Sequence, residues 1–217
     1  MKTSIHPMHR RSYLSFFMMT LFLFLQWFSV NAQDTKDQLF AQLRKKYGSM
    51  QSLEVSFSGV EPISGIHGTL KALRSGKYHI SVSDRSIICD GTTIWNYVPA
   101  RKSVTINTLK SRPASSLDIV LFTFLYNYQP KSLQEFSIGS SLYQGLELIP
   151  KNGKTAMGIK SLTVFVKKGG TDIKRIKAME GQQESVWDIT SLKTNASFAE
   201  SIFSFTPTKD TEIVDLR

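Results

Sequence analysis

Cysteine is almost absent from this chain of 217 residues, in which Cys89 is the only example. A single cysteine cannot form an internal disulfide, so a disulfide-stapled scaffold is excluded and stability must come from the core. Its neighbours Ile87 and Ile88 are apolar, which favours a buried, inert thiol over a reactive one.

Residues for common catalytic chemistry are also scarce. Four histidines are present, and only His67 and His79 follow the N-terminal leader described below. Neither has a partner at metal-ligand spacing, and the sequence contains no Gly-x-Ser-x-Gly elbow, phosphate-binding loop or paired-cysteine zinc motif. We therefore expect a protein that is not an enzyme and binds no cofactor and no metal, although scattered carboxylates could still meet in space.

The first 32 residues have the pattern of a secretory signal peptide. Lys2, Arg10 and Arg11 precede an almost wholly apolar run over 14–30, and Ala32 supplies the small residue of a cleavage site. An uncleaved membrane anchor is the alternative, because the run is at the lower limit of a bilayer span. No cysteine directly follows the run, so the usual bacterial N-terminal acylation is excluded.

Cleavage leaves residues 33–217, which suit a single domain with a sizeable core. The 27 Lys and Arg residues against 17 acidic residues give a net charge of +10, and removing the three basic residues of the leader leaves +7. The basic residues form only short clusters, so we interpret them as solvated faces and expect no nucleic-acid partner.

The hydrophobic pattern predicts an α+β fold. Helical spacing of apolar residues predicts one amphipathic helix from about residue 34 to Tyr47, with Gly48 as its end. A period of two then follows, with tight turns such as Asp90-Gly91 between strands. The predicted strands, roughly ten in all with two or three helices, are 53–57, 66–74, 77–83, 86–90, 93–98, 103–108, 142–149, 159–168, 173–180 and 184–192. A short helix over 197–202 and closing strand pieces at 203–205 and 213–216 complete the pattern.

The middle of the chain interrupts this rhythm. Residues 117–128 read LDIVLFTFLYNY, with apolar residues at helical offsets and few polar ones. A helix that is apolar nearly all round is either buried or covers something apolar. A strand is the alternative here, and for a helix a plug in an ordinary solid core is as consistent with the pattern as a cover over a ligand cavity.

Several segments, in order, resemble the periplasmic outer-membrane lipoprotein carrier family, LolA. Residues 87–99 (IICDGTTIWNYVP) are similar to the family signature I-x-x-D-G-x-x-x-W-x-Y-x-P. Residues 68–74 resemble a segment that ends in a functionally important arginine, here Arg74. Residues 146–150 resemble L-x-L-x-P, and 203–207 with 214–215 resemble the closing F-x-F-x-P and V-D. The resemblance covers essentially all of 33–217.

This resemblance implies an incomplete antiparallel β-barrel of roughly ten to eleven strands, covered by a helical lid over a hydrophobic cavity. It also implies a periplasmic carrier, expected to be monomeric, that receives acylated lipoproteins from an inner-membrane ABC transporter and delivers them to an outer-membrane lipoprotein acceptor. Arg74 falls on an arginine that helps to hold the lid by hydrogen bonds. Family members often have proline after it, whereas this chain has Ser75-Gly76.

A carrier of acyl chains needs an apolar lining with a movable cover, because each CH₂ kept from water is worth about 0.8 kcal/mol. The candidate lipid-binding residues of the sheet are Phe57, Leu70, Tyr78, Ile80, Trp95 and Tyr97. Those of the lid are Leu117, Val120, Leu121, Phe124 and Leu125. For any one of them, plain core packing is the competing interpretation. The nearest functional alternatives are a carrier or sensor of another envelope lipid on the same fold, and an interaction module that binds no lipid.

Overall fold

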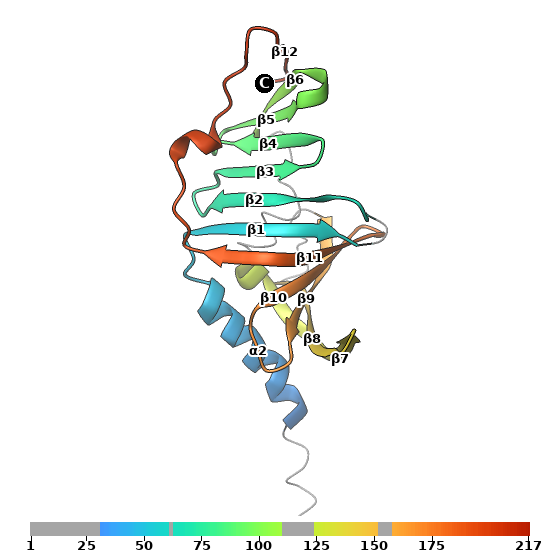
Figure 1. Cartoon of the computed structure of the whole chain (residues 1–217). Coiled ribbons are helices and arrows are strands. Elements are labelled where there is room, and N and C mark those ends of the chain that lie inside the picture. The colour runs from blue at the N-terminus through green and yellow to red at the C-terminus, as the bar shows by residue number, and fades with distance from the viewer. Residues whose placement is uncertain (1–30, 61–62, 110–123, 152–157) are drawn as a thin grey trace, which may run out of the picture.

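A single twelve-stranded sheet dominates the fold (Figure 1). The computed structural model describes residues 31–60, 63–109, 124–151 and 158–217. The strands lie in the order β12-β6-β5-β4-β3-β2-β1-β11-β10-β9-β8-β7. Between these described strands no pairing joins β12 to β7, so the sheet is open. This confirms the predicted incomplete barrel, with twelve strands instead of the roughly ten or eleven that were predicted.

Neighbouring strands are antiparallel except β12 and β6, which are parallel. The bounds are β1 Ser52–Gly59, β2 His67–Leu73, β3 Tyr78–Val82, β4 Arg85–Cys89, β5 Thr93–Val98, β6 Ser103–Thr108, β7 Tyr128–Ile138, β8 Ser141–Pro150, β9 Ile159–Lys167, β10 Ile173–Glu180, β11 Gln183–Thr194 and β12 Glu212–Asp215. Three helices complete the labelled elements, namely α2 Asn31–Tyr47 and the 3₁₀ helices η2 Pro99–Arg101 and η6 Glu200–Phe203.

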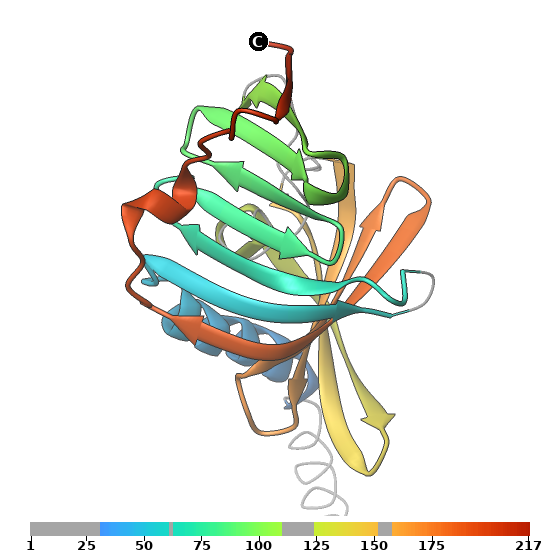
Figure 2. The ribbon, with the colours of Figure 1, turned by 45° about the horizontal axis from the view of Figure 1, so that its top comes forward.

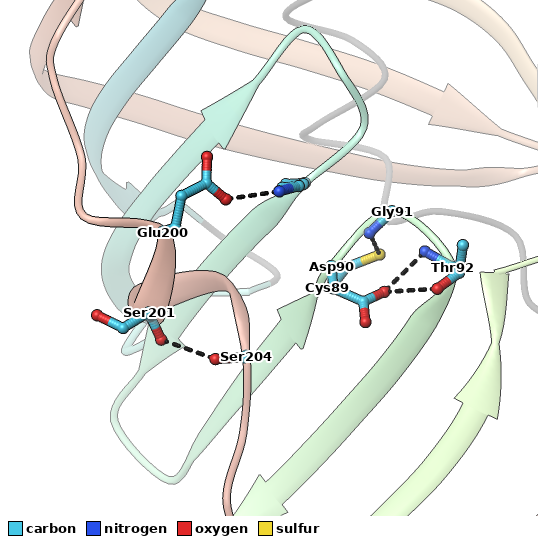
Figure 3. Close-up of polar contacts among 8 residues, drawn as sticks. Cys89, Asp90, Gly91, Thr92, Glu200, Ser201 and Ser204 are labelled. Atoms are coloured by element: carbon cyan, nitrogen blue, oxygen red, sulfur yellow. Dashed lines mark hydrogen bonds and ion pairs between the residues drawn. The ribbon is translucent and has the colours of Figure 1, made fainter.

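The turn between β4 and β5 shows how the local sequence sets the strand pairing. Asp90 Oδ1 accepts hydrogen bonds from the backbone N–H groups of Thr92 and Thr93, at 2.8 and 2.7 Å (the Thr92 contact is shown in Figure 3). Gly91 has a φ of 100°, which only glycine adopts without strain. Burial raises the pKa of Asp90, but these donors outweigh it and lower the pKa overall. The carboxylate therefore stabilises the turn predicted at Asp90-Gly91.

Helix α2 covers one face of the sheet, which we call the inner face. Its side chains at helical spacing, Leu39, Phe40, Leu43 and Tyr47, are buried in one cluster with inner residues of the sheet, and the helix contacts β7 and β8. The predicted helix is confirmed; it begins at Asn31, so the expected cleavage after Ala32 falls in its first turn. Among the described residues, no helix is long and apolar enough to cross a membrane.

The C-terminal segment, residues 195–211, lies on the opposite face, which we call the outer face, before β12 joins the edge of the sheet. Figure 2 shows η6 in front of the sheet and α2 behind it. Phe203 is buried against the outer face, and the ring of Phe205 lies 4.9 Å from that of Tyr97. Lys77 Nζ donates to Glu200, which fixes η6 to the turn before β3. The short helix predicted over 197–202 is therefore the 3₁₀ helix η6, shifted by a few residues.

Strand β7 was not predicted. Its sequence, YQPKSLQEFSI, is mostly polar and exposed, and it contains Pro130 next to a register shift. An edge strand tolerates proline and needs no alternating pattern, because one of its sides is not paired. The predicted helix over 117–128 is helical at 124–127 and becomes β7 at Tyr128, and its earlier part lies outside the described residues.

Candidate functional site

The inner face of β1 to β4 is apolar across the strands, and the register aligns its side chains in rows. One row contains Val55, Leu70, Ile80 and Ile87. The next contains Leu53, Ala72, Tyr78 and Cys89. At the described inner-face positions of β1 to β6, the only charged residue is Arg85, which is exposed at the start of β4 and pairs with Asp84. Apart from Arg85, the described inner-face positions of these strands are therefore uncharged.

Six of the predicted lipid-binding residues meet on this inner surface. Phe57, Leu70, Tyr78 and Ile80 project from β1 to β3, and Phe124 and Leu125 approach them from the helical turn 124–127. All six are buried, with exposed fractions from 0% at Leu70 to 6% at Ile80. These sheet residues lie in one buried cluster with α2 and the helical turn 124–127, which together we call the cover. An apolar ligand would have to displace the cover to reach this face.

Trp95 and Tyr97 lie on the other side of the sheet, so they do not belong with this group. Ile94 pairs with Cys89 of the inner face, and the alternation along β5 therefore directs Trp95 and Tyr97 outward. There Tyr97 packs on Phe205 of the C-terminal segment. The shared face predicted for these two residues is confirmed, but it is the outer face. The remaining lid candidates, Leu117, Val120 and Leu121, lie outside the described residues.

Arg74 joins three segments at the edge of the inner face. Its Nε donates to the Met50 carbonyl and its Nη2 to the Gly48 carbonyl, both at 2.7 Å. Its guanidinium lies 5.9 Å from the ring centroid of Tyr126, whose hydroxyl donates to the same Gly48 carbonyl at 2.6 Å. We call Gly48, Met50, Arg74 and Tyr126 the latch. It connects the end of β2 to the end of α2 and to the helical turn 124–127.

Gly48 is required at the centre of the latch. A Cβ there would lie 2.3 Å from the Arg44 carbonyl oxygen, much closer than real Cβ contacts. The backbone N–H of Gly48 donates to that same oxygen at 2.8 Å and ends α2. The sequence predicted Gly48 as a helix end, but its role as an acceptor for two side chains was not visible in the pattern.

Two polar atoms on the inner face were missed from the sequence. Asn96 Oδ1 on β5 and Trp187 Nε1 on β11 are buried and have no hydrogen-bond partner within the described part of the protein. The register places Trp187 opposite Gly59, next to Phe57, whose ring it meets edge-on at 5.4 Å. A buried polar atom without a partner is uncommon and calls for a specific cause. The sequence carried no signal for it, because the pattern gives a face only relative to its neighbours.

The outer face of β7 to β10 carries a separate hollow of about 270 Å³. Phe136 and Phe165 line it and pack above Gly145, where a Cβ would lie 2.6 Å from the Phe136 ring. Charged Glu147 and Lys177 also line it. This hollow does not communicate with the inner face, because the sheet lies between them.

No group of three or more His, Cys, Asp or Glu side chains suited to a metal ion occurs among the described residues. The most perturbed histidine, His79, is on the outer face. Burial lowers its pKa below the ordinary value; a hydrogen bond with the Ile202 backbone raises it, and the nearby Lys71 charge lowers it. His79 therefore contributes to the packing of the C-terminal segment, away from the inner face.

We compared the chain with protein families, with related sequences and with solved structures. Residues 48–206 match the family described as "Outer membrane lipoprotein carrier protein LolA". An outer-membrane lipoprotein carrier protein of Coxiella burnetii (strain CbuK_Q154) is 24% identical over 204 residues, which cover 89% of this chain and 93% of that protein. One of Klebsiella pneumoniae (strain 342) is 28% identical over 142 residues, 64% of this chain and 66% of that protein. The crystal structure of an uncharacterized conserved protein from Thermus thermophilus matches 84% of this chain and 99% of that chain, with a TM-score of 0.51 and 11% identity, which shows a shared fold.

Proposed function

Because the chain belongs to the LolA family of outer membrane lipoprotein carrier proteins, we propose that it binds the acyl chains of lipoproteins on its inner face and carries them through the periplasm. The leader over 1–32 would direct export and be removed, leaving 33–217 as one carrier domain. A lipoprotein released by an inner-membrane ABC transporter would be the incoming cargo, and a lipoprotein acceptor at the outer membrane would take it over.

The observation that supports this proposal best is the composition of the inner face and of its cover. The face is apolar and almost free of charge, and helices cover it instead of a second sheet. Helix α2 is polar on its other side, where Gln42, Arg44 and Lys45 are exposed. Moving such a helix aside would open apolar surface without unpairing any strand, because its own backbone hydrogen bonds are internal.

In this proposal, the cargo passes to the acceptor because the acceptor binds the acyl chains more tightly than the carrier does. Each acyl CH₂ removed from water contributes about 0.8 kcal/mol, so a long chain binds strongly without any polar anchor. Re-covering the inner face with Phe124 and Leu125, each 1% exposed here, recovers part of that free energy when the cargo leaves. The cover therefore competes with the cargo and keeps binding reversible.

Substitution of Phe124 tests the role of the cover. Phe124→Glu should abolish uptake of a fluorescent fatty acid and of a purified lipoprotein, because a carboxylate would be placed on the apolar face. Phe136→Glu, which changes an exposed phenylalanine on the outer face, is the matched control and should bind normally. Circular dichroism shows whether each variant is folded. Normal uptake by folded Phe124→Glu would contradict the proposed cover.

Native mass spectrometry and lipid extraction of the 33–217 protein, purified from its own periplasm, would name the cargo. A bound triacylated peptide or lipoprotein would support the carrier function. A bound glycolipid or phospholipid would indicate a carrier or sensor of another lipid. An empty protein that also refuses a fluorescent fatty acid would contradict lipid binding and favour an interaction module.

A further inference from the structure

Asn96 stands at the end of an apolar row on the inner face. The register aligns Val55, Leu70, Ile80 and Ile87 from β1 to β4, and Asn96 of β5 is the next member of the row. Asn96 Oδ1 is buried and accepts no hydrogen bond from any residue that the structure describes. A carboxamide oxygen in this condition costs folding free energy that an apolar side chain of similar size would not cost.

The length of the row matches an acyl chain. Adjacent strands lie about 4.8 Å apart, so the four steps from Val55 on β1 to Asn96 on β5 span about 19 Å along the sheet. This is about the extended length of an acyl chain of sixteen carbons. A chain lying across the four apolar strands would therefore bring its carbonyl end to Asn96.

The surroundings of Asn96 restrict the kind of group that can pair with it. Its row continues to Thr105 of β6, so its neighbours in the row are the apolar Ile87 and the uncharged Thr105. No described inner-face position of β1 to β6 carries an acidic residue that would stabilise an ammonium group. A phosphate or carboxylate would bring a second acceptor to Oδ1, and an ester has no donor. A neutral N–H group attached directly to the acyl chain satisfies all of these conditions.

We propose that Asn96 Oδ1 accepts a hydrogen bond from the N–H of an amide-linked acyl chain and selects such chains over ester-linked ones. The selection rests on the proposed function, because it acts on the same inner face. Trp187 Nε1, the other unpaired atom, is five strands away along the sheet, about 24 Å, and cannot hold the same amide.

A pair of ligands that differ in one atom tests this selectivity. Methyl N-palmitoylglycinate has an amide N–H, and methyl palmitoyloxyacetate has an ester oxygen at the same place. Displacement of a fluorescent fatty acid from the 33–217 protein measures both affinities. The variants are Asn96→Leu, which keeps the size, and Asn96→Ala, which is less prone to steric conflict. Thr69→Val, on the exposed outer face of β2, is the control.

We expect the unmodified protein and Thr69→Val to bind the amide about 3- to 10-fold more tightly than the ester, as one net hydrogen bond provides. Asn96→Leu and Asn96→Ala should bind both ligands equally, with the affinity for the ester retained. Equal binding by the unmodified protein, or the same amide preference in the Asn96 variants, would overturn the selection while leaving lipid binding intact. Failure of the unmodified protein to bind the fluorescent fatty acid would overturn the proposed function itself.

Discussion

Arg74 shows how one side chain can couple the cover to the sheet. It is exposed as a residue, yet its guanidinium donates to two carbonyls after α2 and lies over the Tyr126 ring. The planar guanidinium presents several donors in a fixed geometry, which an ammonium cannot reproduce. The sequence singled out this arginine only through a family resemblance. Its partners Gly48, Met50 and Tyr126 became visible in the structure.

Removing this arginine should loosen the latch. We expect Arg74→Leu to lower the free energy of unfolding by about 1–2 kcal/mol, because two charge-assisted hydrogen bonds are lost at a partly solvated site. Hydrogen exchange should rise in 48–50 and 124–127, and Arg74→Lys should restore only part of the protection. Arg101→Leu, at an exposed position on η2, is the control. Unchanged exchange in 124–127 for Arg74→Leu would show that the latch does not hold this turn.

His79 makes a pH-dependent contribution with a definite sign. Its pKa in the folded protein is lowered, first by burial, so the unfolded chain binds a proton in a pH range where the folded protein does not. Stability should therefore fall as the pH drops below about 6.5, the ordinary histidine value, until the folded-state pKa is passed. Melting temperatures across this range would measure the loss. It should disappear in His79→Gln and persist in His67→Asn, which changes an exposed histidine.

At the scale of elements, the C-terminal segment stabilises the outer face as α2 stabilises the inner one. Ile88, Val104 and Ile106 are buried on the outer face. There η6 contacts β3 and β4, and its Phe203 has an exposed fraction of 1%. Two apolar faces on one antiparallel sheet are unusual, since such sheets commonly leave one face to solvent. This second apolar face explains why β5 has aromatic residues on one side and Ile94 on the other.

Truncation of one anchor should release this segment. Phe203→Ala should lower the free energy of unfolding by about 3 kcal/mol, the usual cost of a buried ring. Phe205→Ala, whose ring is half-buried on Tyr97, should cost less. Fatty acid binding should remain in both variants, because neither residue lies on the inner face. Loss of binding in Phe203→Ala at a temperature where it is folded would contradict the separation of the two faces.

The elements that the sequence predicted correctly are those with a strong period and a clear stop. Helix α2 and strands such as β2, β3 and β5 follow the apolar spacing. Gly48 follows α2, and the turns after the strands contain Gly76, Asp84 and Pro99. Strand β7 was missed because an edge strand with Pro130 has no such period. Trp95 and Tyr97 were assigned to the lining because alternation fixes only which residues share a face. Which face is inner depends on where α2 packs, and that is a long-range contact.

At the scale of the whole molecule, the lone cysteine is a natural probe of the inner face. Cys89 is fully buried between Tyr78 and Ile94 in the inner cluster, and it forms no disulfide. Its Sγ accepts a hydrogen bond from the Gly91 N–H at 3.3 Å (Figure 3). A thiol reagent can therefore reach it only when the cover moves or the sheet opens.

The rate of Cys89 modification should report that opening. In the folded 33–217 protein we expect slow labelling by a disulfide reagent, faster labelling in Arg74→Leu, and protection when a fatty acid is bound. Reductant should leave the melting temperature unchanged, because no disulfide contributes to stability. Labelling as fast as in denaturant would show that the inner face is not covered in solution.

Strands β1 and β11 are paired in the sheet but are synthesised many seconds apart. Gln183, the first residue of β11, follows Gly59, the last of β1, by about 125 residues, which at translation rates of about 5–20 residues per second take about 6–25 seconds to emerge. During this interval β1 has one unpaired edge, next to the apolar side chains of Leu53, Val55 and Phe57. Until the sheet is complete, the growing chain therefore exposes a strand edge that can pair with another chain and aggregate.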